Sequence, residues 1–373
     1  MALSQFVAMP KPKMKLSRIG LQHCWRGSVH DYVRAIVWSP TGQTLAIASA
    51  AGEVVLWTGT DQSLFYLQTA GQLAIDALGF SADGQFLAAG GQDGQVRIWE
   101  MTALTSKPLL AFNYAPAWVE RLAWHPHRPL LAFSLGKYVQ VWDLEQQALV
   151  TTLNFANSSV LGLSWQRGGN GLGVAGYGGI KLWDSRDWDE DPYHLEIGSA
   201  TIAIAWSPDG CYLAAGNMDR TITVIEWDAD AVQSQRLLPW VMRGFPGKVR
   251  HLAWSEGRHG RDFLLAAASS EGIVVWERHP DPTIGWSGQV LQHHQDVVQG
   301  IGFQPQTTLL ASVAADGLGL WQRANQLACS HSEGEARLSA LAWQPQGQWL
   351  ATGGEGGELS IYGLTTTGQG FGS

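Results

Sequence analysis

The sequence predicts an all-β fold assembled from copies of one small sheet, and three observations support this prediction. First, a pattern of short apolar strands separated by Gly, Pro and Asp turns recurs eight times along the 373 residues. Second, no long stretch shows the apolar period of a helix. Third, the chain contains 19 Trp and 44 Gly, which suit the packing and the tight turns of such sheets.

Each copy consists of three recognisable strands. The first is a short apolar strand that ends in Trp or Phe, and a turn such as SPDG at Ser207–Gly210 follows it. A second strand of small apolar residues leads through a Gly turn into a third, alternating strand such as QVRIW at Gln95–Trp99. The aromatic residues that end the first strands are Trp38, Phe80, Trp124, Trp165, Trp206, Trp254, Phe303 and Trp343. The copies end near Trp57, Trp99, Trp142, Trp183, Ile225, Trp276, Trp321 and Tyr362.

The arrangement of the copies follows from the need of each sheet to bury its two faces. A sheet of three or four strands cannot bury both of its faces alone, whereas sheets packed radially, face to face, can. We expect residues 16–363 to form one closed ring, with a tail at 1–15 and a Gly-rich tail at 364–373. Eight copies favour eight blades, with seven as the alternative. The N-terminal segment Leu16–Cys24 is predicted to close the ring by pairing with Leu359–Tyr362, which removes a free sheet edge.

These repeats resemble those of the WD-repeat β-propeller family. The WD dipeptide stands at Trp142–Asp143 and Trp183–Asp184, and it is shifted by two residues at Trp227–Asp228. We identify the chain as a member of this family, of a bacterial type with divergent repeats. The resemblance implies a non-enzymatic scaffold that binds a partner protein or peptide, because WD propellers mostly assemble protein complexes.

Composition narrows the possible functions. The net charge of -8 and the pI of about 5.7 are unlike those of a general nucleic-acid binder. The three cysteines lie too far apart to suggest a disulfide framework, which favours a reducing compartment. The chain has no signal-peptide pattern and no run of 18 apolar residues. We therefore expect a cytoplasmic protein without nucleic-acid or membrane partners.

The histidine pair in QHHQDVVQGIGF, Gln292–Phe303, is the most conspicuous candidate for chemistry. The resemblance implies that one of the pair belongs to a buried hydrogen-bond network of a single repeat. The members of that network are His294, Ser312, Asp316 and Trp321. The other repeats mostly lack the matching His and Asp, so we expect apolar packing to hold them. His293 has no role in the pattern.

The sequence contains only weak signals of metal binding or catalysis. His125 and His127 could share a metal ion, but two ligands do not make a site, so we expect solvated loop histidines and no bound metal. GLGVAG at Gly171–Gly176 has the letters of a dinucleotide fingerprint but lies inside a strand. We expect no catalytic residue, no cofactor and no enzymatic activity. The alternatives are an accessory protein that binds a small ligand or metal and, less favoured, a hydrolase acting at the channel mouth.

A partner is expected to bind where the first strands begin, at the rim of the central opening. The candidate rim residues are Tyr32, Arg34, Asp76, Trp118, Glu120, Lys248, Arg250 and Arg337. Cations come from repeats six, eight and one, and carboxylates from repeats two and three. We expect an acidic part of the partner to lie toward the cations, and an ordinary solvated rim is the alternative. A separate acidic stretch, DSRDWDEDPYHLE, links repeats four and five.

Overall fold

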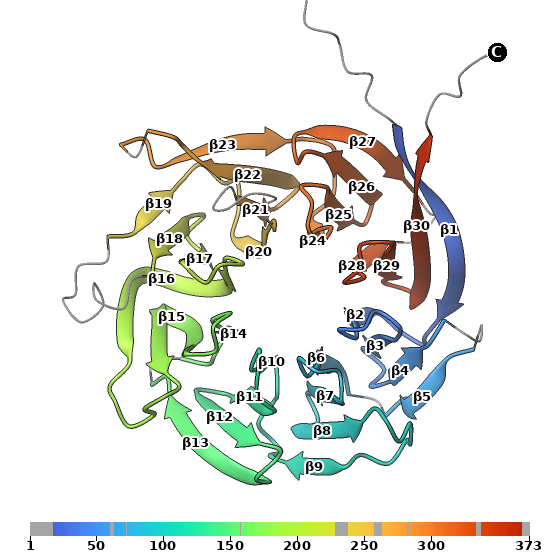
Figure 1. Ribbon diagram of the computed structural model, residues 1–373, viewed down its shortest axis with the longest axis vertical. Coiled ribbons are helices and arrows are strands. Elements are labelled where there is room, and N and C mark those ends of the chain that lie inside the picture. Colours follow the sequence, from blue (N-terminus) through green and yellow to red (C-terminus); the bar gives the residue numbers. More distant parts are fainter. Residues whose placement is uncertain are drawn as a thin grey trace, which may run out of the picture.

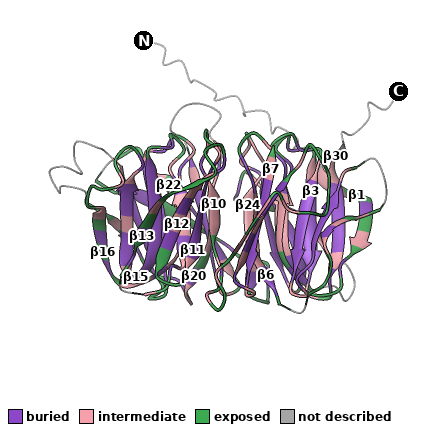
Figure 2. Ribbon diagram, turned by 90° about the horizontal axis from the view of Figure 1, so that it is seen from below, coloured by how far each residue is buried: buried purple, intermediate pink, exposed green. Residues whose placement is uncertain are grey.

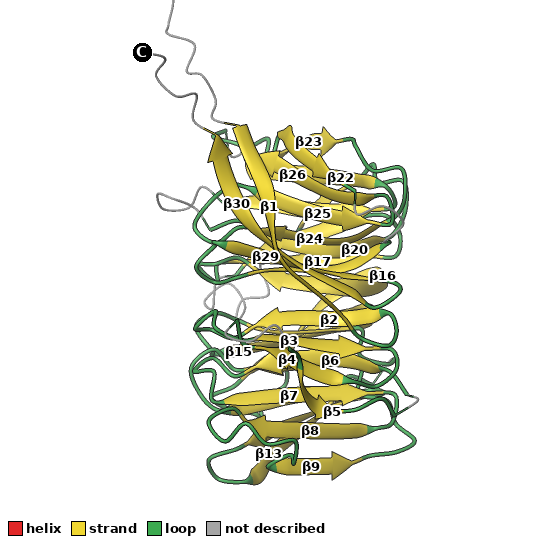
Figure 3. Ribbon diagram, turned by 90° about the vertical axis from the view of Figure 1, so that its right-hand side faces the viewer, coloured by secondary structure: helices red, strands yellow, loops and turns green. Residues whose placement is uncertain are grey.

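The computed structural model describes residues 18–59, 63–71, 73–156, 158–227, 238–256, 263–281, 283–332 and 337–367. All regular elements in these residues are strands, and they surround a central channel (Figure 1). Seen from the side, the strands fill the body of a disc and the loops cover its two faces (Figure 3). The buried residues concentrate in the strands between these faces (Figure 2).

The repeats follow one another around the ring. Repeat one contains β2 (Val33–Trp38), β3 (Leu45–Ser49), β4 (Val54–Trp57) and β5 (Phe65–Gln68). Repeat two contains β6 (Ile75–Phe80), β7 (Phe86–Gly91), β8 (Gln95–Glu100) and β9 (Leu110–Asn113). Repeat three contains β10 (Leu122–Trp124), β11 (Leu130–Leu135), β12 (Tyr138–Asp143) and β13 (Ala148–Asn154). Repeats four and five contain β14 (Gly162–Trp165), β15 (Gly171–Asp184), β16 (Tyr193–Trp206), β17 (Tyr212–Asn217), β18 (Ile222–Glu226) and β19 (Trp240–Met242).

The remaining repeats complete the circle. Repeat six contains β20 (Val249–Trp254), β21 (Leu264–Ser269), β22 (Gly272–Arg278) and β23 (Trp286–Leu291). Repeat seven contains β24 (Val298–Phe303), β25 (Leu310–Ala314), β26 (Gly317–Gln322) and β27 (Gln326–His331). Repeat eight contains β28 (Leu338–Trp343), β29 (Trp349–Gly354) and β30 (Glu358–Thr367), and β1 (Arg18–Ser28) joins its sheet. Every pairing between these strands is antiparallel.

The expectation of eight separate blades needs correction. The strands form seven sheets, the number given as the alternative, because repeats four and five share one six-stranded sheet. Strand β16 causes this merger: its first half pairs with β15, where Leu195 lies opposite Ile180. Its second half pairs with β17, where Ile204 lies opposite Ala215. The fourth strand of one repeat thus continues directly into the first strand of the next.

Apolar packing joins neighbouring repeats. Each boundary between consecutive repeats holds a cluster of buried apolar side chains, and the first strands contact one another around the whole channel. At the boundary of repeats eight and one, Trp57 packs with Ile361. Burial of such side chains contributes about 1.5–3 kcal/mol each relative to exposure.

The tryptophans that end the first strands add a hydrogen bond to this packing. The indole nitrogen donates to a backbone carbonyl of the preceding repeat's first strand over 2.8 to 3.1 Å. The donors with this bond are Trp38, Trp124, Trp165, Trp254 and Trp343. Trp206 differs, since its buried Nε1 has no partner among the described residues. The bond is therefore missing within the shared sheet of repeats four and five.

The residue after each of these aromatics takes one of two roles. A serine there, such as Ser207, caps its own turn by accepting from a backbone N–H, here that of Tyr212 at 2.8 Å. A glutamine or histidine instead reaches the turn of the next repeat. Gln166 donates to the Gly210 carbonyl at 3.0 Å, and His125 Nε2 lies 3.1 Å from the Gly169 carbonyl oxygen.

His125 is buried, which corrects the expectation of a solvated loop histidine. Its Nδ1 accepts the backbone N–H groups of His127 and Arg128, both at 3.0 Å, so Nε2 carries the proton and donates to Gly169. Burial and the nearby Arg128 lower its pKa to about 4. The side chain is therefore a neutral clamp between repeats three and four.

His125→Gln is expected to remove part of the acid sensitivity of the fold. Below pH about 6.5 the unfolded chain protonates this histidine and the folded chain does not, so stability falls as the pH drops toward 4. At pH 5 this site alone lowers the free energy of unfolding by about 2 kcal/mol. Glutamine makes the same clamp in other repeats without titrating. Urea unfolding at pH 8 and pH 5 should show a smaller loss in the variant; an equal loss in both proteins would contradict the assignment.

Closure of the ring by the N-terminal strand is confirmed. Strand β1 pairs with β30, and His23 lies opposite Tyr362. Trp25 turns inward, where its ring centroid lies 5.5 Å from that of Trp57 in repeat one. Strand β30 continues to Thr367, so the first four residues of the predicted C-terminal tail belong to the sheet. The predicted start of the closing strand at Leu16 lies outside the described residues.

Candidate interaction face

One face of the disc carries the starts of the first strands, and we call it the rim face. The turns between second and third strands lie on the same face, because their backbone N–H groups bond to residues at or just before the starts of the first strands. Ala50 donates to the carbonyl of Tyr32 at 2.8 Å, and Met218 donates to the carbonyl of Ala200 at 2.9 Å. The other face carries the closing aromatics of the first strands, and we call it the opposite face.

A β-bulge near the start of the first strand shapes the rim in six repeats. The register shifts there by one residue, as between Val33 and Ala35 in β2. A bulged residue leaves the regular pairing, and this re-aims its side chain. The bulged residues are Arg34, Asp76, Ile202, Arg250, Gln299 and Ser339. All of these except Asp76 line the channel, which encloses about 500 Å³.

The structure changes the predicted charge pattern of the rim. Arg34 pairs directly with Asp76, and its guanidinium lies 5.9 Å from the ring centroid of Tyr32. Arg337 pairs with Glu355 at 2.8 Å. Two of the four predicted cations are therefore neutralised locally, and the expected separation into a basic and an acidic sector is wrong for them.

Repeat six keeps its positive charge. Neither Lys248 nor Arg250 has a carboxylate partner within the part of the chain that the structure describes. Burial and the charge of Arg250 lower the pKa of the adjacent His251 to about 4, so this histidine is neutral at pH 7. Arg250 is thus the exposed cation of the channel wall in this repeat.

Arg121 is a further channel cation that the sequence analysis missed. It follows the predicted Glu120 directly, and it lines the channel although repeat one has Ala35 at the equivalent position. Its side chain donates to the backbone carbonyls of Leu161 and Glu120, both at 2.8 Å. These bonds fix the guanidinium, and backbone carbonyls leave its charge uncompensated. In the sequence, only the position of Arg121 next to the rim carboxylate Glu120 could have indicated this role.

Large apolar side chains are exposed on the rim face of three consecutive repeats. Trp118 of repeat three is 50% exposed, Tyr177 of repeat four 60% and Met218 of repeat five 47%. Only Trp118 was predicted. Tyr177 lies within β15 opposite Ala200, and Met218 lies in the turn between β17 and β18. The available signal was a large apolar residue directly before Gly178 or Asp219. We call these three side chains the apolar arc.

The predicted four-residue network is assembled inside repeat seven. His294 Nδ1 lies 2.7 Å from Asp316 Oδ1 and its Nε2 lies 2.8 Å from Ser312 Oγ. Trp321 Nε1 donates to the same hydroxyl at 2.9 Å. Burial lowers the pKa of His294, so the neutral ring donates to Asp316 and accepts the Ser312 hydroxyl. His293 remains exposed.

Other repeats also contain buried polar networks, which corrects the expectation that apolar packing alone would hold them. In repeat one the buried carboxylate of Glu53 binds His30 and accepts the hydroxyl of Ser49 at 2.8 Å. In repeat five the amide of Asn217 accepts from Thr201 at 2.8 Å and donates to Thr223 at 3.1 Å. Different residue types serve each repeat, so a search for one His and Asp pattern overlooks them.

Over the described ranges, no three or more His, Cys, Asp or Glu side chains come together in a group that could hold a metal ion. The same residues contain no helix that is long and apolar enough to cross a membrane.

Comparison with known proteins agrees with this architecture. Residues 21–58, 65–100, 194–226 and 325–362 match the WD40 family, described as "WD domain, G-beta repeat". WD repeat-containing protein VIP3 of Arabidopsis thaliana is 30% identical over 186 residues, which cover 45% of this chain and 55% of that protein. Transducin beta-like protein 3 of Mus musculus is 25% identical over 257 residues, which cover 65% of this chain and 31% of that protein.

A further relative and a solved structure extend the comparison. Periodic tryptophan protein 2 homolog of Caenorhabditis elegans is 28% identical over 212 residues, which cover 54% of this chain and 23% of that protein. The chain thus spans 23 to 55% of the length of these three relatives. All three come from eukaryotes, so nothing here supports the bacterial-type, divergent subclass.

The fold likeness covers nearly the whole ring. A chain in the crystal structure of the mitotic checkpoint complex superposes with a TM-score of 0.61 at 18% identity, covering 97% of this chain and 98% of that chain. Together with the ring of antiparallel sheets, this likeness shows the fold. The chain folds as a β-propeller, and four of its segments are similar to WD repeats.

Proposed function

We propose that this protein is a non-enzymatic, cytoplasmic scaffold that presents its rim face to a partner protein or peptide. The observation that carries the proposal is the apolar arc of Trp118, Tyr177 and Met218 on the same face as Arg250, which has no carboxylate partner among the described residues. Trp, Tyr, Met and Arg are enriched at protein interfaces, and Trp, Tyr and Arg dominate their binding energy. A chain of the same fold occurs in the mitotic checkpoint complex, which supports an assembly role.

The two parts of the rim face suit different parts of a partner. The apolar arc offers large surfaces that lose water on binding, and it supplies most of the affinity. Arg250 and Lys248 attract an acidic side chain toward the channel mouth. Arg34 and Arg337 contribute less than their sequence positions suggest, because Asp76 and Glu355 already neutralise them.

Capture of partners by variants of the tagged protein tests this proposal. The double variant Trp118→Ala with Tyr177→Ala is expected to lower the recovery of specific partners by about tenfold or more, as measured by quantitative mass spectrometry. Arg250→Glu is expected to lower the recovery of the same partners and to make the remaining binding less sensitive to salt.

The outer strand β13 offers a matched control. Leu149 and Val150 are 44% and 40% exposed there, away from both faces. The double variant Leu149→Ala with Val150→Ala removes a similar kind of surface and is expected to retain the partners. Loss of partners in this control, with full recovery in the rim variants, would refute the rim-face proposal. Unchanged melting temperatures must show that all variants are folded.

A further inference from the structure

The opposite face carries a second cavity, unrelated to the rim. It encloses about 330 Å³ between the ends of β15 and β18 and the loop that joins β15 to β16. Its aromatic lining residues are Trp183, Tyr193 and Trp227, and its acidic ones are Asp184, Glu190 and Asp191. This volume falls within the range of small-ligand pockets. The acidic stretch that the sequence analysis singled out forms one wall.

The aromatic side of the cavity is held in place by ring contacts. The ring centroids of Tyr193 and Trp227 lie 6.0 Å apart at an interplanar angle of 76°. Behind them, Trp227 packs edge-on against Trp206 at 5.8 Å and 89°. Burial raises the pKa of Tyr193, so its phenol stays neutral. The faces of such rings are electron-rich and attract organic cations.

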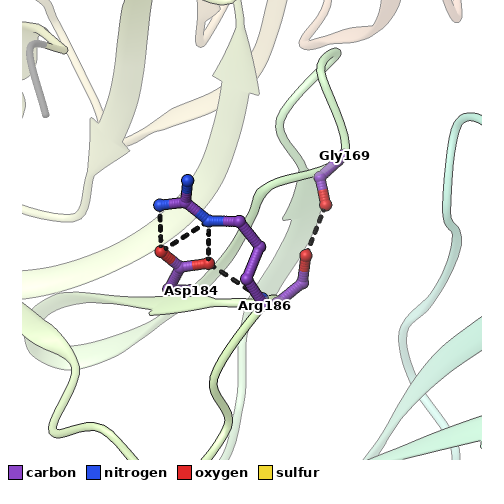
Figure 4. A network of polar contacts seen from close by, with 4 residues as sticks. Gly169, Asp184 and Arg186 are labelled. Carbon is purple, nitrogen blue, oxygen red and sulfur yellow. Dashed lines mark hydrogen bonds and ion pairs between the residues drawn. The ribbon is translucent and has the colours of Figure 1, made fainter.

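The charge of the loop is strongly unbalanced. Residues 184–193 contain five carboxylates and one cation, Arg186. Arg186 is engaged by Asp184, whose two carboxylate oxygens accept its Nε at 2.9 and 3.1 Å (Figure 4). This hydrogen bonding lowers the pKa of Asp184. Glu190 and Asp191 are left without an ion-pair partner among the described residues.

The loop is anchored before any ligand arrives. Next to the Asp184–Arg186 pair, the Ser185 hydroxyl donates to the Gly169 carbonyl at 2.7 Å, a bond drawn in Figure 4. The Ser185 N–H also donates to the carbonyl of Asn170 at 2.9 Å. Pre-formed walls reduce the ordering entropy that a ligand must overcome.

We propose that this cavity binds a lysine side chain of a basic peptide segment. The ammonium group lies against the faces of Trp227 and Tyr193 and beside the carboxylates of Glu190 and Asp191. Two more carboxylates of the loop, Asp187 and Asp189, lie outside the cavity lining. Negative charge that extends beyond the pocket suits a chain with several cations better than a single small ammonium ion. The protein then holds partners on both faces of the ring.

Fluorescence anisotropy with a labelled hexalysine peptide tests the proposal on the full chain. The double variant Glu190→Gln with Asp191→Asn is expected to weaken binding about tenfold, because it removes the two cavity carboxylates that have no ion-pair partner among the described residues. The matched control Asp187→Asn with Asp189→Asn removes the same charge from the same loop outside the cavity. It is expected to weaken binding less than about threefold.

Two further comparisons distinguish binding in the cavity from binding to a diffuse acidic surface. Trp227→Leu keeps every charge and is expected to weaken hexalysine binding about fivefold by removing the aromatic face. Equal weakening by the two carboxylate variants, or no effect of Trp227→Leu in a folded protein, would overturn the proposal. If Trp227→Leu does not fold, the two carboxylate variants still test the proposal, provided that their melting temperatures are unchanged.

Competition distinguishes the source of the cation. Tetramethylammonium carries the same chemistry without a peptide, and it is expected to displace hexalysine only at a much higher concentration. Displacement at concentrations similar to those of free hexalysine would instead indicate a small ammonium ligand. The rim variants Trp118→Ala and Arg250→Glu should leave hexalysine binding unchanged, so this proposal and the rim-face proposal can fail separately.

Discussion

Deletion of residues 1–28 is expected to abolish the cooperative unfolding of the whole ring. The deletion removes β1, which supplies the fourth strand of the last sheet and pairs with β30 along its length. It exposes the edge of β30 and uncovers the cluster in which Trp25 and Val29 pack with repeat one. Removal of one such Trp costs about 3–5 kcal/mol, so the total effect approaches the entire stability of a typical domain.

The deletion of residues 1–17 is the control, because it leaves β1 intact. Circular dichroism melting should show a sharp transition in the control and a broad one at much lower temperature in the longer deletion. A synthetic peptide of residues 18–28, added in excess, is expected to restore part of the melting temperature by binding the folded form. A sharp transition at the wild-type temperature after deletion of residues 1–28 would show that β1 does not close the ring.

His294→Ala is expected to lower the free energy of unfolding by about 3 kcal/mol. The imidazole joins Asp316 to Ser312 in one buried network, and the variant leaves the serine hydroxyl and the carboxylate each short of a partner. It also leaves a cavity beneath Trp321, whose indole bonds to the same hydroxyl. Urea unfolding at pH 7.5 measures the loss.

His293→Ala is the matched control for this network, since it removes the same side chain one residue earlier. His293 is exposed and makes ring contacts with His294 and Trp321 at centroid distances of 5.3 and 6.1 Å. Its removal is expected to change the stability by less than about 0.5 kcal/mol. Similar losses in the two variants would mean that the pair acts through local packing rather than through the hydrogen bonds of His294.

The order of the strands and the closure of the ring could be predicted because they depend on local patterns. Alternating apolar residues and Gly turns define each strand, and the unpaired apolar segment around Cys24 had only one free edge to cover. The merger of repeats four and five could not be predicted in this way. It depends on β16 remaining extended through Gly198 without a break. No residue in this part of the sequence distinguishes a continuous strand from two strands joined by a turn.

The sequence by itself determined the repeat, the antiparallel sheets and the candidate rim positions, because these follow from periodicity. The members of the His294 network were implied by the resemblance to WD repeats. The tertiary structure decided which charges remain available. Asp76 neutralises Arg34 from the neighbouring repeat, whereas Arg250 lines the channel and pairs with no carboxylate in the part of the chain that the structure describes. It also brought Trp227 of repeat five against the acidic loop of repeat four. Contacts between repeats join residues about 40 positions apart, and Coulomb attraction and ring packing depend on distance in space, which no local pattern encodes.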